Sequence, residues 1–242
     1  MSFRLYLASL LLLCSQLIQA APPLRVLTED YPPFNMLGPG GRVSGLSSDI
    51  VQELFRRAGV AYGIELLPWI RAFNLTVLEA NTCLYSTTRT ESREHQFKWI
   101  GPLVENPWVL YARADNRHAI LSLEEARSFK IGGYSGDATS QYLIDRGFDV
   151  DLANTDQLNV KKLLVGRIDF WATGKYLGAS LLAREKVSQL KPVLTFNTTL
   201  LYLACNPAMP DSQVQQLNEL LRGMQRDGTL ARINAKYLNQ KD

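Results

Sequence analysis

The stretch Thr82-Cys83-Leu84-Tyr85-Ser86-Thr87-Thr88-Arg89-Thr90-Glu91-Ser92-Arg93 places an apolar run directly before a polar one. Residues 82–86 predict a β-strand, because short apolar and β-branched runs bounded by polar residues are typical of strands. The residues that follow predict a loop rich in hydroxyl groups and arginine. In open α/β sheets, ligands bind beyond the carboxyl ends of the strands, so this loop is a candidate binding site.

Strand-like and helix-like segments alternate on both sides of that stretch. Short apolar runs predict strands, and apolar residues spaced three and four apart predict helices. The predicted strands are 24–28, 64–67, 82–86, 108–112, 130–132, 168–172 and 200–205. The predicted helices are 50–58, 70–80, 137–146, 155–166, 174–185, 214–224 and 230–237, and the capping-box order Ser122-Leu123-Glu124-Glu125 predicts one more. Two βαβα blocks predict an α/β fold with two lobes, each built on a mostly parallel sheet.

The N-terminus has the order of a secretory leader. Arg4 supplies a positive charge, residues 5–13 an apolar core, and Ala20 a small residue at the cut. The apolar run is shorter than the roughly 20 residues that span a membrane. We therefore predict a signal peptide over residues 1–20, with an uncleaved N-terminal anchor as the alternative.

Composition excludes several partners. A formal net charge of +3 is too weak a bias to favour nucleic acid or a membrane surface. The two histidines, His95 and His118, lie far apart and near no cysteine pair, so no structural zinc site is predicted. No later segment is long and apolar enough to span a bilayer.

The cysteines that follow the leader are Cys83 and Cys205. A secreted protein could pair them, but two cysteines do not define a disulfide framework. Both lie in apolar, strand-like runs, where a lone thiol behaves as a small buried hydrophobe. We expect two free, buried thiols, with a disulfide as the alternative.

No catalytic motif in the chain is complete. Gly133-Tyr134-Ser135-Gly136-Asp137 has the start of a nucleophile elbow, but it lacks the closing glycine, and no histidine lies near it in the chain. The sequence also has no phosphate-binding loop and no dinucleotide fingerprint. No enzyme activity and no cofactor are therefore predicted.

Several stretches, in this order, resemble periplasmic solute-binding protein family 3, the class that includes histidine- and lysine/arginine/ornithine-binding proteins. They are 28–34, 45–54, Pro68, 86–93, Phe97, 132–139, 165–169 and 226–229. The resemblance implies a type II two-lobed fold with a two-stranded hinge near 104–106 and 198–200. It implies lobe 1 at 21–105, lobe 2 at 106–199, and a return strand and helices at 200–242 that complete lobe 1.

The resemblance also implies a function. The lobes would close around a small polar solute, carboxylate-bearing and related to an amino acid, in the periplasm. The protein would act as a monomer and pass the solute to an ABC-type transporter.

The same resemblance assigns ligand-binding roles. Arg93 matches the arginine that grips the ligand carboxylate, a role that suits the planar fork of a guanidinium. Ser86 and Thr88 match hydrogen-bonding positions. Trp69 and Tyr31 match the walls of the pocket, although either ring could belong to the core instead. The predicted ligand-binding residues are Asp30, Tyr31, Trp69, Ser86, Thr88, Arg93, Asp137 and Ala138.

Two positions depart from the family pattern. Gly174 stands where the second lobe of the family has an aspartate for the α-ammonium group, and Asp137 stands where a hydroxyl residue often helps to hold the carboxylate. Either Asp137, Glu29 or Asp30 binds the amine, or the ligand is not an α-amino acid.

Two other functions stay open. One is a dehydratase of the same fold, which acts on a cyclohexadienyl acid and needs a general acid such as Glu29, Asp30 or Asp137. The other is a soluble sensory or partner-docking module.

Overall fold

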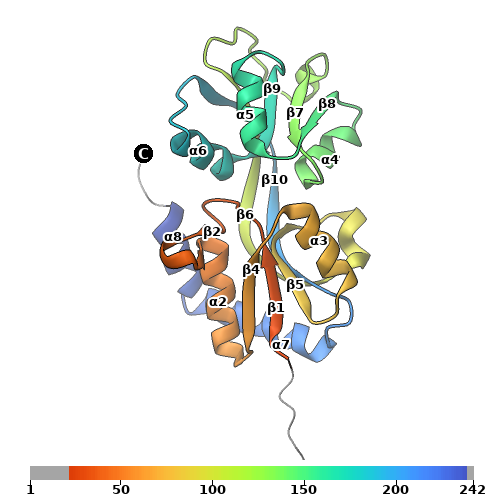
Figure 1. Cartoon of the computed structure of the whole chain (residues 1–242), viewed down its shortest axis with the longest axis vertical. Helices are drawn as coiled ribbons and strands as arrows, with labels where there is room; N and C mark the ends of the chain where they lie inside the picture. The colour runs from red at the N-terminus through yellow and green to blue at the C-terminus, as the bar shows by residue number, and fades with distance from the viewer. Residues whose placement is uncertain (1–21, 239–242) are drawn as a thin grey trace, which may run out of the picture.

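The computed structural model describes residues 22–238, which form two lobes joined by two long strands, β6 (Lys98–Arg113) and β10 (Leu190–Cys205) (Figure 1). These strands run antiparallel to each other through both lobes. Within the pair, 104–106 lies opposite 199–201, close to the predicted hinge segments. The predicted two-lobed α/β fold is confirmed. The predicted signal peptide, 1–20, lies outside the described residues.

Lobe 1 is built on three parallel strands, β1 (Leu24–Thr28), β4 (Tyr62–Leu66) and β5 (Thr82–Thr88). Side chains alternate between the faces of a strand, so the sheet buries two sets of residues. Val26 and Cys83 face the cluster that contains α2 (Leu46–Ala58) and α7 (Asp211–Arg226), whereas Leu27 and Leu84 face α3 (Trp69–Leu78). The last helix, α8 (Thr229–Leu238), also packs on α2. A hairpin of β2 (Met36–Leu37) and β3 (Val43–Ser44) lies outside this sheet.

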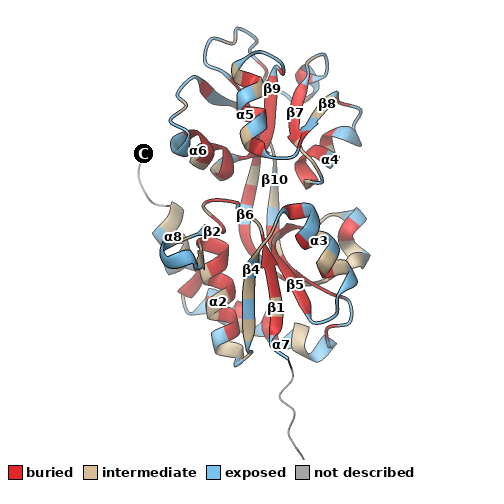
Figure 2. Cartoon of the chain, in the orientation of Figure 1, coloured by how far each residue is buried: buried red, intermediate tan, exposed pale blue. Residues whose placement is uncertain are grey.

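Lobe 2 has three parallel strands, β7 (Ile131–Tyr134), β8 (Val150–Ala153) and β9 (Phe170–Gly174). Its helices are α4 (Ala138–Ile144), α5 (Asp156–Leu164) and α6 (Lys175–Arg184). The strands of both lobes join one sheet in the order β4-β1-β5-β10-β6-β9-β7-β8. Strands β1, β5 and β9 and the inward helix faces are buried, whereas the edge strand β4 and the outer faces of the helices carry exposed residues (Figure 2).

We propose the divisions 105/106 and 199/200 as the limits of the lobes. β10 pairs with β5 only from Leu201 onward, and β6 pairs with β9 only from Trp108 onward. The segments between these pairings therefore carry the chain from one lobe to the other.

The helix predicted from the capping box at Ser122–Glu125 is only a short 3-10 segment, Glu124–Ala126. The reciprocal bonds of a capping box do not form: Ser122 Oγ and the Leu121 N–H both donate to the Glu125 carboxylate, and the segment has no side-chain cap. No helix follows because β7 begins at Ile131.

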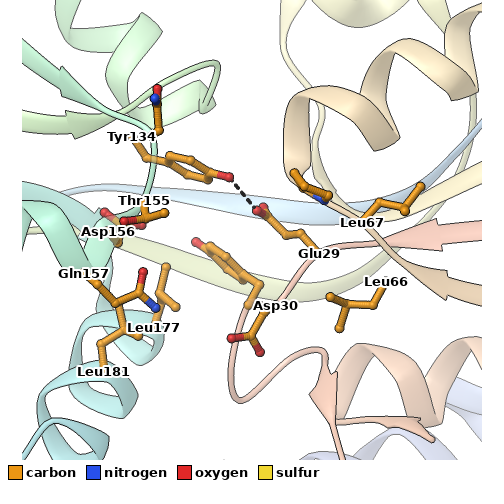
Figure 3. Close-up of a pocket in the computed structure, with 13 residues that line it drawn as sticks. Glu29, Asp30, Leu66, Leu67, Tyr134, Thr155, Asp156, Gln157, Leu177 and Leu181 are labelled. Atoms are coloured by element: carbon orange, nitrogen blue, oxygen red, sulfur yellow. Dashed lines mark hydrogen bonds between the residues drawn. The ribbon is translucent and has the colours of Figure 1, made fainter. Parts of the chain in front are cut away.

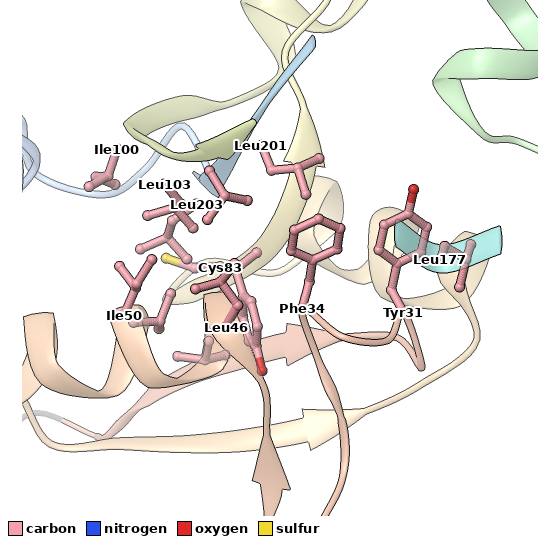
Figure 4. Packing of buried hydrophobic residues seen from close by; sticks show 14 of the residues in the cluster. Tyr31, Phe34, Leu46, Ile50, Cys83, Ile100, Leu103, Leu177, Leu201 and Leu203 are labelled. Carbon is pink, nitrogen blue, oxygen red and sulfur yellow. The ribbon is translucent and has the colours of Figure 1, made fainter. Parts of the chain in front are cut away.

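The expectation of free thiols is wrong. Cys83 and Cys205 form a disulfide that joins β5 to β10 across 122 positions of sequence. Antiparallel pairing places the two residues directly opposite each other, with a Cα–Cα distance of 4.0 Å. Both are fully buried, and Cys83 lies among the packed side chains of lobe 1 (Figure 4). The return strand is therefore covalently held in lobe 1.

Candidate functional site

Loops from both lobes meet in the cleft beside the crossing strands, and side chains of lobe 1 bond directly to lobe 2. The indole Nε1 of Trp69 donates to Gly136 O at 2.9 Å. Tyr134 donates its hydroxyl to Glu29 Oε2 at 3.1 Å (Figure 3). Because Trp69 follows β4 and Glu29 follows β1, the carboxyl ends of lobe 1 strands face the loop after β7, where an α/β fold places its ligand.

Arg93 lies between the lobes with only 8% of its surface exposed. It follows β5 in a 3-10 segment, Glu91–Gln96. Its Nη1 donates to Thr88 O at 3.1 Å and its Nη2 to Gly136 O at 3.1 Å. Burial lowers the pKa of Arg93, while the charges of Asp137 and Glu29 oppose that shift. An arginine stays protonated in proteins, so this is a buried cation held by backbone carbonyls.

The two aromatic residues of the predicted site are both buried. Trp69 is 4% exposed, and the Arg93 Cζ lies 5.3 Å from its ring centroid. Tyr31 stacks on Phe34 at 5.7 Å, and its hydroxyl accepts from Asn106 Nδ2 at 3.1 Å. Tyr31 also lines a cavity between the lobes, so it belongs to the core and to a cavity wall together.

Ser86 and Thr88 lie at the end of β5, and their hydrogen bonds are made to other residues of lobe 1. Ser86 has φ of 61°, in the left-handed region, and its hydroxyl bonds to the Asn35 side chain. Thr88 is buried, and its carbonyl accepts from Arg93. The arrangement makes Thr88 a residue that orients Arg93.

The two acidic residues of the predicted site, Asp30 and Asp137, have different surroundings. Asp30 is exposed and forms an ion pair with Arg184 of lobe 2 at 3.2 Å. Asp137 caps α4, where its Oδ1 accepts from the N–H of Ala138 at 2.7 Å. Burial raises the pKa of Asp137, and the nearby Arg93 lowers it. Ala138 is buried beside this cap.

Three cavities have walls from both lobes, and one of them, about 610 Å³, lies beside the Asp30–Arg184 ion pair. The other two contain the remaining residues of interest. A cavity of about 820 Å³ is lined by Arg93, Phe73, Gly136 and Ala138 with aromatic rings of lobe 2. A second cavity, of about 320 Å³, is lined by Glu29, Asp30 and Tyr31 of lobe 1 and by lobe 2 residues that include Tyr134 and Asp156 (Figure 3). Both volumes lie in the range of small-molecule sites.

Asp156 was missed in the sequence analysis. It is the first residue of α5, 8% exposed, and accepts from the indole of the buried Trp171 at 2.7 Å. Burial is the main reason that its pKa rises to about 7. Burial, and then the charge of Asp137, also raises the pKa of Glu29 well above its usual value. In the sequence, Asp156 indicated only the start of a helix after Thr155. A helix start gives no reason to expect a cavity.

We predict that the pH dependence of stability reports the burial of Asp156. A carboxyl whose pKa is near 4 in the unfolded chain and about 7 in the folded protein destabilises the fold progressively as pH rises through that window. Denaturant unfolding of the wild type and of Asp156→Asn should therefore show the wild type losing up to about 4 kcal/mol relative to the variant between pH 4 and 7.

Asp149→Asn, at an exposed aspartate of the same lobe, is the matched control. Its stability difference from the wild type should not change in that window. A constant difference for Asp156→Asn across pH 4–7 would contradict the prediction.

Within residues 22–238, no group of three or more histidine, cysteine or acidic side chains is arranged to hold a metal ion. In the same range, no helix is both long enough and apolar enough to cross a membrane.

The sequence profile of the bacterial extracellular solute-binding proteins, family 3, matches residues 24–240. The chain belongs to this family. The family 3 resemblance inferred from the order of the motifs is confirmed, and so is a function in binding a small polar solute. The match covers both lobes and the C-terminal helices, so the whole described fold is that of a family 3 protein.

Three known proteins are similar to this chain. The L-cystine-binding protein TcyJ of Escherichia coli (strain K12) is 21% identical over 210 residues, which cover 86% of this chain and 79% of that protein. The crystal structure of a histidine kinase sensor domain with similarity to periplasmic binding proteins has a TM-score of 0.82 and 20% identity, over 89% of this chain and 96% of that one. An ancestral amino acid-binding protein, a precursor of cyclohexadienyl dehydratase, has a TM-score of 0.75 and 20% identity, over 89% and 94%.

Proposed function

We propose that this family 3 protein binds a small amino-acid-like solute, with a carboxylate and a positive charge, between its lobes in the periplasm and passes it to an ABC-type transporter. The observation that supports this most is Arg93, a buried guanidinium that touches both lobes and lines the larger cavity. The similarity to an L-cystine-binding protein and to an ancestral amino acid-binding protein favours the same solute class.

Arg93 can exchange a hydrogen bond to a backbone carbonyl for one to a ligand carboxylate. Its Nη2 bonds to Gly136 O, a neutral carbonyl of lobe 2. A carboxylate is the stronger acceptor, because hydrogen bonds between ionised partners are about twice as strong as neutral ones. A ligand carboxylate would therefore take the place of Gly136 O and be enclosed as the lobes close.

Hinge motion is consistent with the contacts between the lobes. Besides the crossing strands, the lobes touch through the bonds Trp69–Gly136, Arg93–Gly136, Tyr134–Glu29 and Asn106–Tyr31 and the ion pair Asp30–Arg184. They also touch through apolar rings, since Phe34 packs edge-on against Tyr176 at 5.9 Å. Water can replace the polar contacts when the lobes separate. Solute would enter by opening at the crossing strands.

A thermal-shift screen tests the proposed function. We expect at least one of L-cystine, L-arginine, L-histidine, L-glutamate and L-phenylalanine to stabilise the protein, by about 2.7 kcal/mol at 100 times its Kd. The stabilisation should disappear in Arg93→Ala. No stabilisation by any of these compounds, or stabilisation that persists in Arg93→Ala, would contradict the proposal.

A dehydratase is the second candidate, because Glu29 lies in the cleft with a raised pKa, the state that a general acid needs. The similarity to a precursor of cyclohexadienyl dehydratase points the same way. Turnover of prephenate or arogenate by the wild type, lost in Glu29→Gln, would establish this function instead.

A further inference from the structure

The cavity of about 820 Å³ at Arg93 has aromatic walls from both lobes. Phe73 of α3 lines it from lobe 1, and Trp108 of β6 and Tyr142 of α4 line it from the other side. Helices α3 and α4 lie on the same side of the crossing strands, at the facing edges of the two lobes (Figure 1). Aromatic rings attract one another beyond the effect of the area they bury. The walls therefore favour a ligand that carries an aromatic ring.

Arg93 supplies the buried charge of this cavity. A guanidinium has five N–H groups, and within residues 22–238 Arg93 forms two hydrogen bonds, to the neutral carbonyls of Thr88 and Gly136. Glu91 and Asp145 also line the cavity, but they are exposed, so water and salt screen their charges. Because Gly136 lines the same cavity, a carboxylate that replaces its carbonyl at Arg93 lies inside this cavity.

The aromatic walls lie close to the arginine. The Cζ of Arg93 is 5.3 Å from the ring centroid of Phe73, so a short chain is enough to join a carboxylate at Arg93 to a ring at Phe73. From lobe 2, the guanidinium of Arg146 covers the Tyr142 ring, with its Cζ 3.5 Å from the centroid. Guanidinium planes also stack on aromatic rings. Phe73 and the Tyr142–Arg146 pair thus offer contacts to one ring from the two lobes.

The ring and the carboxylate have their partners within one cavity. Its volume of about 820 Å³ lies in the range of small-molecule sites. It shares no lining residue with the cavity at Glu29 and Asp156, so no part of the bound molecule has to pass from one cavity to the other.

We propose that the solute is an aromatic carboxylate, bound with its carboxylate at Arg93 and its ring between Phe73 and Tyr142. The class consists of carboxylates joined to a ring by a short chain, as in phenylalanine and 3-phenylpropanoate. The proposal rests on the proposed function, since it takes Arg93 as the carboxylate anchor. Closure of the lobes would bring the two aromatic walls onto the ring.

Two series of compounds isolate the ring. L-Phenylalanine, L-cyclohexylalanine and L-alanine share the carboxylate and the ammonium group and differ in having an aromatic ring, a saturated ring or no ring. 3-Phenylpropanoate, 3-cyclohexylpropanoate and propanoate repeat the comparison without the ammonium group. Isothermal titration measures each Kd for the wild type and for three variants.

The variants remove one ring each. Phe73→Leu and Tyr142→Leu change the two walls, and because these residues belong to different lobes, either variant decides the test if circular dichroism shows that the other does not fold. Tyr202→Leu is the matched control. Tyr202 packs on Trp99 with ring centroids 5.8 Å apart, and it lines none of the three cavities between the lobes.

In at least one series, the wild type should bind the aromatic compound about tenfold or more tightly than the compound without a ring, because a buried phenyl group leaves water. It should also bind the aromatic compound about fivefold or more tightly than the saturated one, since each of two aromatic contacts contributes about two- to tenfold. Each wall variant should lower this second preference by about twofold or more. Tyr202→Leu should leave it unchanged.

Three results would overturn the inference: equal binding of the aromatic and saturated compounds, an aromatic preference that survives every folded wall variant, or no binding of either aromatic compound. If such a result comes together with an Arg93-dependent stabilisation in the thermal-shift screen, the proposed function stands and only the assignment of the ring is wrong. If that screen is also empty, both fail.

Discussion

Replacing both Cys83 and Cys205 by alanine is expected to lower the free energy of unfolding by about 2–5 kcal/mol. The disulfide joins residues 122 positions apart, a separation for which loop-closure entropy in the unfolded chain amounts to about 5 kcal/mol. For a chain of this size the melting temperature should fall by roughly 10 °C. Denaturant unfolding and calorimetry of the two proteins measure both quantities.

The single variants separate the covalent bond from the loss of packing. Both cysteines are fully buried, so each alanine also removes some packing. If the bond dominates, Cys83→Ala alone destabilises the protein nearly as much as the double variant does. If packing dominates, the two single changes add up to the double. A double variant within about 0.5 kcal/mol of the wild type would show that the bond contributes nothing.

The position of the bond explains why its loss should spare binding. It joins β5 to β10 in the part of lobe 1 that packs on α2 and α7. None of the residues that line the cavities between the lobes belongs to this pair. Affinity for a compound that stabilises the wild type in the thermal-shift screen should therefore be unchanged at a temperature where the variant remains folded.

Arg93→Ala is expected to weaken binding of each compound that stabilises the wild type in the thermal-shift screen by about 100-fold or more. Each hydrogen bond to a charged group contributes about 1.5–3 kcal/mol, and a guanidinium can give two to one carboxylate. Arg93→Lys keeps the charge but loses the planar fork, so its loss should be intermediate. Calorimetric titration of the variants gives the affinities, and circular dichroism shows whether they fold.

Asp137→Asn is the matched control for this experiment. Asparagine caps helices as well as aspartate does, so α4 keeps its cap while the charge near Arg93 is removed. Carboxylate binding should stay unchanged or tighten, because a repulsive charge is gone. Affinities of Arg93→Ala within a few-fold of the wild type would rule out Arg93 as the anchor. A large loss in Asp137→Asn would indicate that Asp137 holds the amine.

The local pattern of the sequence predicted the elements and the order of the lobes. Strand β1 lies at 24–28 as predicted, and β5 extends two residues beyond the predicted 82–86. Such elements are encoded by spacing over a few residues, which a single sequence displays directly. The polar run after β5 also placed Arg93 beyond the end of a strand, where the structure has it. The motif order was enough to identify the family.

Contacts between distant residues were not accessible in that way. Cys83 and Cys205 are paired by the antiparallel register of β10 against β5, and nothing within either strand specifies that register. Gly174 meets Tyr31 because the loop after β1 lies against the end of β9 in the other lobe. The residues around Asp156 indicate only the start of a helix. Asp156 lines a cavity because the start of α5 and the leucines of lobe 1 border the same space.

The sequence by itself therefore determined which segments are strands and helices, that they form two lobes, and which strand end carries the arginine, because these depend on local periodicity. The tertiary structure alone decided the disulfide, the contact between Gly174 and Tyr31 and the residues that line the cavities. Each of these depends on residues far apart in the chain, brought together by strand register and by the approach of the two lobes.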